Sequence, residues 1–166
     1  ITLYGGTFIT SSPLTLGNAV VLGGNANLAT SGTLGLAGPV TLAADATLTQ
    51  TSTAGIVNFD AGIGGAHGLT LDATAPWGGF NFTTPNNYAG TTTVRGNAQL
   101  ALTATGTVPG DLVVNAGGAV VAQGSGHFAP TANLTINSTG ANVPSPVSGL
   151  EFVNAVEQVS SEREGD

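Results

Sequence analysis

The sequence of 166 residues has no cysteine, no methionine and no lysine, and charged residues make up only 7% of it. Without cysteine the chain has no disulfides, no thiolate catalysis and no Cys-ligated metal. Two arginines are too few to neutralise a run of phosphates, so we expect neither nucleic acid nor anionic membrane surfaces as partners. The scarcity of charged side chains and of strong helix formers excludes a helical protein with a charged surface.

Long apolar runs are missing as well. No stretch of about 18 apolar residues is present to form a membrane-spanning helix, so we expect no direct membrane insertion. The first residues, Ile1 to Tyr4, lack the basic start and apolar centre of a signal peptide and already follow a strand-like pattern. We therefore expect the chain to be a piece of a longer protein.

The sequence is instead rich in the residues of strands and corners. It contains 26 glycines with many Thr, Asn and Ala, and 41% of its residues are apolar. Short alternating apolar runs between Gly, Asn or Pro corners predict strands, of which the clearest are 26–30, 33–36, 56–59, 69–72, 80–83 and 134–137. The recurrence of Leu, Val and Ile in these runs excludes a disordered chain.

Three segments share one pattern of an alternating apolar pair, a corner and a second apolar pair. Residues 13–22 are answered by residues 39–48 at an offset of 26, and residues 110–121 repeat the pattern. A repeat of about 20–30 residues without a crossover helix is typical of a parallel β-solenoid. We predict an all-β parallel β-helix over residues 1–149, with about six rungs roughly 4.8 Å apart. An antiparallel sandwich is the alternative.

The most regular stretch lies between residues 86 and 102. Its ordered positions are Asn86, Tyr88, Gly90, Thr92, Val94, Gly96, Leu100 and Leu102. Together with the Gly-rich residues 62–68 and the strand-like residues 69–71, they resemble the autotransporter-associated β-strand repeat. The sequence departs from that repeat at residues 75–82, where Ala-Pro-Trp-Gly-Gly-Phe-Asn-Phe replaces a Gly-x-Leu-x-Leu strand.

The resemblance implies a right-handed β-helix in the exported passenger region of a large bacterial surface protein. Such a segment is a stalk or the body of an adhesin. The resemblance also implies an extracellular or cell-surface location, with the signal and translocator regions outside this chain.

Four carboxylates precede the acidic tail. Asp60 and Asp72 follow strands and are candidates for the carboxylate pair of a glycoside hydrolase if they share a face. Corner capping accounts for them equally well, and Asp45 and Asp111 have the positions of ordinary turn residues. We expect no catalytic residue among them.

Two histidines, His67 and His127, lie in Gly-rich loops. Neither has an acid at metal-ligand spacing, so we expect exposed histidines, no metal site and no cofactor. The Ser125 that precedes His127 lacks the setting of a hydrolase nucleophile.

Aromatic residues gather only around Trp77, Phe80, Phe82 and Tyr88. Phe80 and Phe82 share one strand face, and we expect these rings to fill the solenoid interior. The alternative is an outward platform for stacking a sugar ring, with Trp77 and Asn81 as the candidate glycan-binding residues.

The last residues, 150–166, change in character. Five of the nine acids of the chain lie here, and the formal net charge of the chain is −7. Phe152, Val153, Val156 and Val159 have helical spacing, which predicts an amphipathic helix over 150–160. We expect this segment to cap the last rung or to lead into a further domain.

These patterns predict a structural stalk or adhesive segment rather than an enzyme. Open solenoid ends expose unpaired strand groups, so a second hypothesis is a self-assembling extracellular fibre. Its subunits would pair by end-to-end or lateral β-stacking. A polysaccharide-active enzyme is the third hypothesis, and cell-surface glycans are the partners expected for an adhesive segment.

Overall fold

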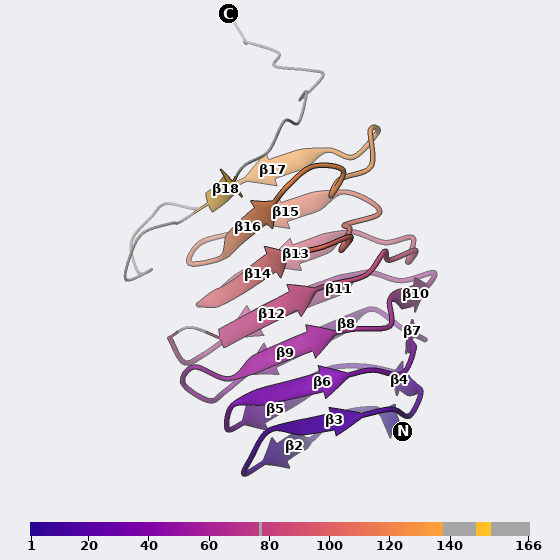
Figure 1. The fold of residues 1–166 in the computed structure, drawn as a ribbon, viewed down its shortest axis with the longest axis vertical. Helices are drawn as coiled ribbons and strands as arrows, with labels where there is room; N and C mark the ends of the chain where they lie inside the picture. Colours follow the sequence, from indigo (N-terminus) through magenta and orange to yellow (C-terminus); the bar gives the residue numbers. More distant parts are fainter. Residues whose placement is uncertain (77, 138–148, 154–166) are drawn as a thin grey trace, which may run out of the picture.

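The computed structural model describes residues 1–76, 78–137 and 149–153, which form a parallel β-solenoid (Figure 1). The described residues contain eighteen strands and no helix, and thus no helix long enough to cross a membrane. Every pairing between these strands is parallel, which excludes the antiparallel sandwich. The predicted all-β solenoid is therefore confirmed.

The strands stack into three sheets, one on each side of the coil. Sheet A contains β1 (Thr2–Leu3), β4 (Val20–Leu22), β7 (Val40–Leu42) and β10 (Ile63–Gly65). Sheet B contains β2 (Thr7–Thr10), β5 (Ala26–Thr30), β8 (Ala46–Gln50), β11 (Leu69–Ala73), β13 (Thr92–Val94), β15 (Leu112–Val114) and β17 (Leu134–Ile136). Sheet C contains β3 (Leu14–Leu16), β6 (Thr33–Leu36), β9 (Ile56–Phe59), β12 (Gly78–Phe82), β14 (Ala98–Leu102), β16 (Ala119–Gln123) and β18 (Gly149–Val153).

Each rung passes through sheet A, then B, then C before the chain starts the next rung. In Figure 1 the sheet C strands run to the right across the front and the sheet B strands return behind them. The chain climbs from indigo to yellow at the same time, so the coil is right-handed. The predicted handedness is therefore confirmed.

Strand alternation fills the interior of this coil. Inward positions carry Leu, Val, Ile, Phe or Ala, and Leu71, Phe82 and Leu100 are all fully buried. Outward positions on the same strands carry Thr, Asn or Gln, as at Thr70, Asn81 and Gln99. Because successive side chains of a strand point to opposite faces, this period of two places one apolar column inside each sheet.

The strand predictions hold better than the predicted repeat offset. Segments 26–30, 33–36 and 56–59 coincide with β5, β6 and β9, and the other predicted strands lie within two residues of β11, β12 and β17. The offset of 26 is wrong. Val40 pairs with Val20, a step of 20 residues, and later steps reach 23 residues. All three sides share one apolar alternation, so the sequence match compared a sheet C strand, β3, with a sheet A strand, β7.

The helix predicted over 150–160 is wrong where the structure describes it. Residues Gly149–Val153 form β18, which pairs in parallel with β16. The edge of the preceding rung offers unpaired backbone groups, and a segment that joins this edge satisfies them as a strand. The predicted positions Val156 and Val159 lie outside the described residues.

Sheet A extends only as far as β10. Above this level the same side of the coil consists of residues 83–91, 103–111 and 124–133, which contain no named strand. A single isolated bridge joins Val108 to Phe128 there. Other groups must therefore satisfy the backbone on this side, and the candidate site lies at this transition.

Candidate functional site

Asn86 is the residue at which the side chains begin to replace the sheet A ladder. Its side chain is 7% exposed, and its Oδ1 accepts a hydrogen bond of 2.7 Å from the Ile63 N–H in the rung below. Its Nδ2 donates to the Thr107 carbonyl in the rung above at 2.7 Å, and the Thr107 hydroxyl accepts from the Asn86 N–H at 2.9 Å. One asparagine therefore connects three successive rungs.

Tyr88 occupies the interior next to this connection. The ring is 1% exposed, and its hydroxyl hydrogen-bonds the hydroxyl of Thr92, a residue that is itself fully buried. Burial raises the pKa of the Tyr88 hydroxyl well above its ordinary value, while the hydrogen bond to Thr92 opposes part of that rise. The pair gives two buried hydroxyls a mutual partner, which avoids the cost of leaving either unsatisfied.

The remaining motif positions are also fixed by packing. Val94, Leu100 and Leu102 are fully buried in the core. A side chain at Gly90 would collide with the Gly68 backbone, and Gly96 has φ +66, where its Cβ would meet the Asp72 carboxylate. We call the group formed by Asn86, Tyr88, Thr92 and Thr107 the polar seam. The structure assigns these groups to rung-to-rung contacts, with no ligand required.

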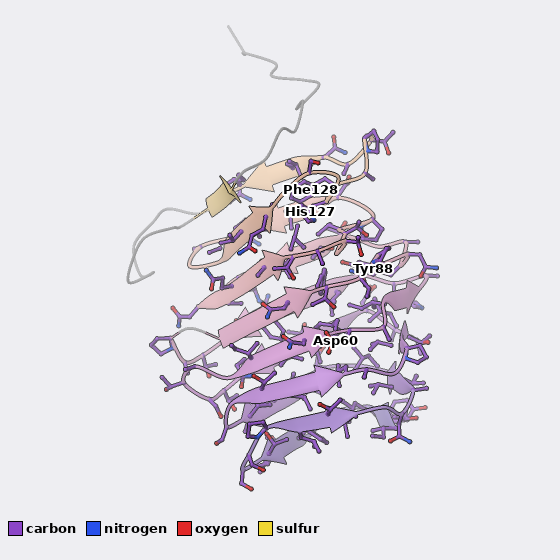
Figure 2. All side chains as sticks on the ribbon, viewed as in Figure 1. Asp60, Tyr88, His127 and Phe128 are labelled. Atoms are coloured by element: carbon purple, nitrogen blue, oxygen red, sulfur yellow. The ribbon has the colours of Figure 1, made fainter. Side chains whose placement is uncertain are left out.

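His127 extends the same side of the solenoid upward, and Figure 2 shows it above Tyr88, which lies above Asp60. The predicted exposure of His127 is wrong, because the residue is 1% exposed. Its Nδ1 lies 2.6 Å from the Gly106 carbonyl oxygen and its Nε2 lies 2.9 Å from the Gln123 carbonyl oxygen. The ring is the only side chain near that bend that reaches both carbonyls, so sequence position in a Gly-rich loop was a misleading signal.

Corner carboxylates and amides join rungs on the opposite side of sheet A. Asp45 Oδ1 accepts from the Gly68 N–H at 2.7 Å, and Asp111 Oδ1 accepts from the Asn133 N–H at 2.8 Å. Asn25 does the same for the Thr47 N–H at 2.9 Å. These side chains cap the backbone of the following rung at the corner, consistent with their turn-like sequence setting.

The two carboxylates considered as a catalytic pair lie on different sheets. Asp60 follows β9 of sheet C and accepts a hydrogen bond of 3.0 Å from the Thr83 hydroxyl. Asp72 lies on β11 of sheet B, where its Oδ2 accepts from Arg95 Nε at 2.9 Å. Each carboxylate has its own partner, and the structure does not bring the two onto one face.

The aromatic rings lie in the core. Phe80 and Phe82 are fully buried, and Phe82 makes an edge-to-face contact with Phe59 at 5.4 Å between ring centroids. Asn81 lies on the outer face of sheet C, where its Nδ2 donates to Asn58 Oδ1 at 2.8 Å. Trp77 lies outside the described residues, so its part in glycan stacking stays a prediction.

A hollow lies in the outer surface beside the polar seam. One part has a volume of about 380 Å³ and is lined by residues that include Pro39, Thr41, Gly62, Gly64, Pro85 and Asn87. A second part has a volume of about 400 Å³ and is lined by residues that include Asn25, Asp45, Thr47, His67, Thr70 and Thr91. We call these two hollows together the trench.

Charge in the trench is confined to one pair. His67 Nδ1 lies 3.7 Å from Asp45 Oδ1, and both side chains are solvent-accessible. The part of the chain that the structure describes contains no group of three His, Asp or Glu side chains able to hold a metal ion. The trench therefore offers hydroxyl, amide, carboxylate and imidazole groups for hydrogen bonding.

Sequence reasoning missed several of these residues. The Thr107 partner of Asn86 and the buried Gln50, whose Nε2 donates to Thr30 Oγ1 at 2.8 Å, are ordinary polar residues in the sequence. The Gly-rich residues 62–68 were the available signal for the trench. Comparisons of the chain with protein-family models, with curated proteins and with solved structures found no match.

Proposed function

We propose that the chain is a rigid, non-catalytic stalk or adhesive segment of an exported bacterial surface protein. We further propose that residues 62–102 are an autotransporter-associated β-strand repeat. The observation that carries the proposal is the use of the motif residues. Asn86, Tyr88 and Thr92 are buried and bonded within the solenoid, so the motif serves as a building unit of successive rungs.

The ladders support a mechanical role. Two sheets of seven parallel strands run the length of the described solenoid, and one apolar core lies between them. In such a stack each rung contacts only its neighbours, so length is added without changing the cross-section. This property suits a spacer that holds another part of a protein at a distance.

A distance measurement by pulsed electron spin resonance tests the rigidity that this role requires. The chain lacks cysteine, so Thr7→Cys and Thr135→Cys introduce two unique labelling sites. Both residues are exposed on sheet B, on β2 and β17. Six strand spacings between them predict a Cα separation of about 29 Å, with a narrow distribution of label distances.

A matched pair within one rung provides the control for label mobility. Thr7→Cys combined with Thr33→Cys joins sheet B to sheet C near the same end of the coil. A distribution for the long pair that is as narrow as that of the short pair supports the stalk. A broad or bimodal distribution for the long pair alone would reject a rigid spacer.

One observation favours the self-assembling fibre as a second candidate. The face formed by β1, β2 and β3 exposes Ile1, Tyr4, Ile9 and Leu14, which are 39–78% exposed. A small apolar hollow at this face leads into the interior beside Phe8 and Leu16. We propose that this face pairs end to end with another copy, because unpaired strand edges and apolar surface favour association.

Negative-stain electron microscopy over increasing protein concentration tests this second candidate. Filaments with an axial repeat of a whole number of rungs support end-to-end pairing. An Ile9→Lys variant should then abolish the filaments, because it places a charge at the pairing face. Discrete particles at all concentrations would reject the fibre and leave the stalk.

A further inference from the structure

The trench has one cause in the sequence. Residues 61–68 read Ala-Gly-Ile-Gly-Gly-Ala-His-Gly, and Ile63 is buried, so no outward side chain larger than a methyl group precedes His67. The rungs on either side keep exposed side chains at the matching positions, such as Thr41 and Asn87. One rung therefore forms the floor of the trench, and its two neighbours form the walls.

The trench runs along the strand direction. Its two parts lie next to each other on the same rung, from Gly62 to Gly68. The walls are two rungs apart, which corresponds to roughly 9.6 Å between their backbones. At the corner, Gly68 leaves the floor open between Asp45 below and Thr91 above. An elongated ligand fits this shape better than a compact one.

The backbone of the floor is already committed to the neighbouring rungs. The Gly62 carbonyl accepts from Val40, and the Ile63 and Gly65 carbonyls accept from the rung above. The Ile63 N–H donates to Asn86 and the Gly68 N–H donates to Asp45. A peptide strand could not add to this backbone as it adds to a free sheet edge. Recognition must come from the side chains of the walls.

The wall side chains have the chemistry of hydroxyl recognition. Thr41, Thr70 and Thr91 both donate and accept, Asn87 offers an amide, and Asp45 offers carboxylate oxygens. No Lys or Arg lines either part of the trench, so an anionic ligand would have no positive partner other than His67. A single carboxylate is also a poor set of ligands for a metal ion.

We propose that the trench binds a linear, neutral oligosaccharide, whose hydroxyls bond the wall side chains while the chain lies along residues 62–68. Pro39 and Pro85 border one end of the trench and give the sugar rings an apolar contact. Asp45 and His67 lie at the other end, where the carboxylate accepts bonds from sugar hydroxyls. The stalk role requires no ligand, so this inference goes beyond it.

Amide chemical shifts of the ¹⁵N-labelled chain test the proposal. The probes are cellohexaose, mannohexaose and chitohexaose, with calcium chloride as a separate titration. At least one hexasaccharide should shift amides of residues 41–47, 62–70 and 85–91 together. No shift with any of the three sugars at millimolar concentration would overturn the proposal, as would shifts caused by calcium alone.

Two variants test whether the trench itself is responsible. Gly64→Thr fills the floor, and its Cβ would meet only the movable end of the Asn87 side chain, at 2.9 Å. Thr70→Val removes one wall hydroxyl that makes no hydrogen bond within the described structure other than through its backbone. Gly64→Thr should weaken binding at least about tenfold, and Thr70→Val about three- to tenfold.

Matched controls lie one rung outside the trench in the same columns. Val21→Thr lies below Thr41 on sheet A, and Thr93→Val lies above Thr70 on sheet B. Both should change the affinity less than about twofold, because neither residue lines the trench. Equal weakening by the controls, or sugar-induced shifts centred on another face, would contradict the proposal. The label distance between positions 7 and 135 should stay the same in every variant, so loss of binding is distinct from failure of the stalk.

Discussion

The side of the solenoid that carries sheet A is held together in two different ways. Below Gly65 the rungs are joined by backbone pairs between β1, β4, β7 and β10. Above it the polar seam and His127 connect the rungs through side chains, and one isolated bridge is the only named strand pairing among the described residues there.

The difference teaches where polar side chains become structural. A buried backbone group must have a partner, and a ladder supplies it without any demand on the side chain. When the ladder ends, a specific donor or acceptor must take over, and only certain side chains fit. Mutations of outward polar residues in the lower part should therefore be harmless, whereas mutations of the seam should be costly.

The largest contrast is expected between two adjacent asparagines. Asn86→Ala leaves the Ile63 N–H and the Thr107 carbonyl without their partners, and should lower the free energy of unfolding by about 2–5 kcal/mol. Asn87→Ala removes an exposed side chain and should cost less than about 0.5 kcal/mol. Urea denaturation of both variants measures the contrast. Equal values would show that the seam does not replace the ladder.

A thermodynamic cycle sharpens the comparison inside the seam. Tyr88→Phe leaves the buried Thr92 hydroxyl without its partner, which should cost about 1–3 kcal/mol. Thr92→Val alone should cost a similar amount. The double variant removes both hydroxyls and should be destabilised by clearly less than the sum, with a coupling above about 0.5 kcal/mol. Additive effects would mean that the two hydroxyls do not depend on each other.

Alkaline pH should weaken the upper part through Tyr88. Its pKa is raised in the folded state, so its contribution is complete below the ordinary tyrosine pKa of about 10 and is lost as pH rises toward the raised pKa. Stability should fall by about 1.4 kcal/mol per pH unit above pH 10. Tyr88→Phe should flatten this decline, whereas Tyr4→Phe, at a side chain that is 78% exposed, should not.

The smallest effect is expected at the surface ion pair of sheet B. Arg95 is about half exposed and bonds Asp72 at 2.9 Å. Arg95→Gln should cost at most about 1 kcal/mol, and the loss should shrink at 1 M salt because exposed charges are screened. Thermal unfolding at low and high salt measures it. A loss above 2 kcal/mol would place this pair among the structural contacts of the seam.

The sequence predicted the repeating strands well because alternation and glycine corners are local features. Strands β5, β6 and β9 have the predicted ends, since each is bounded by Gly, Asn or Ser within a few residues. The step between rungs is not local. It depends on which side of the coil a strand occupies, and the three sides have the same apolar pattern, so the offset of 26 was wrong.

The seam was predictable only in part. The order of Asn86, Tyr88 and Thr92 marked the stretch, but the partner Thr107 lies 21 residues away and is set by the rung step. His127 shows the same limit, because its burial depends on carbonyls at residues 106 and 123. Side chains that join rungs have partners about one turn away, and a single sequence does not give that distance.

Hydrogen exchange at the Ile63 amide tests most directly whether side chains replace the ladder. In the unmodified chain this amide donates to Asn86 Oδ1, while the Val40 amide donates to the backbone carbonyl of Gly62. The account predicts that the two amides exchange at similar rates, and that Asn86→Ala speeds exchange at Ile63 at least about tenfold more than at Val40. Fast exchange of Ile63 in the unmodified chain, or an equal effect of Asn86→Ala on both amides, would contradict it.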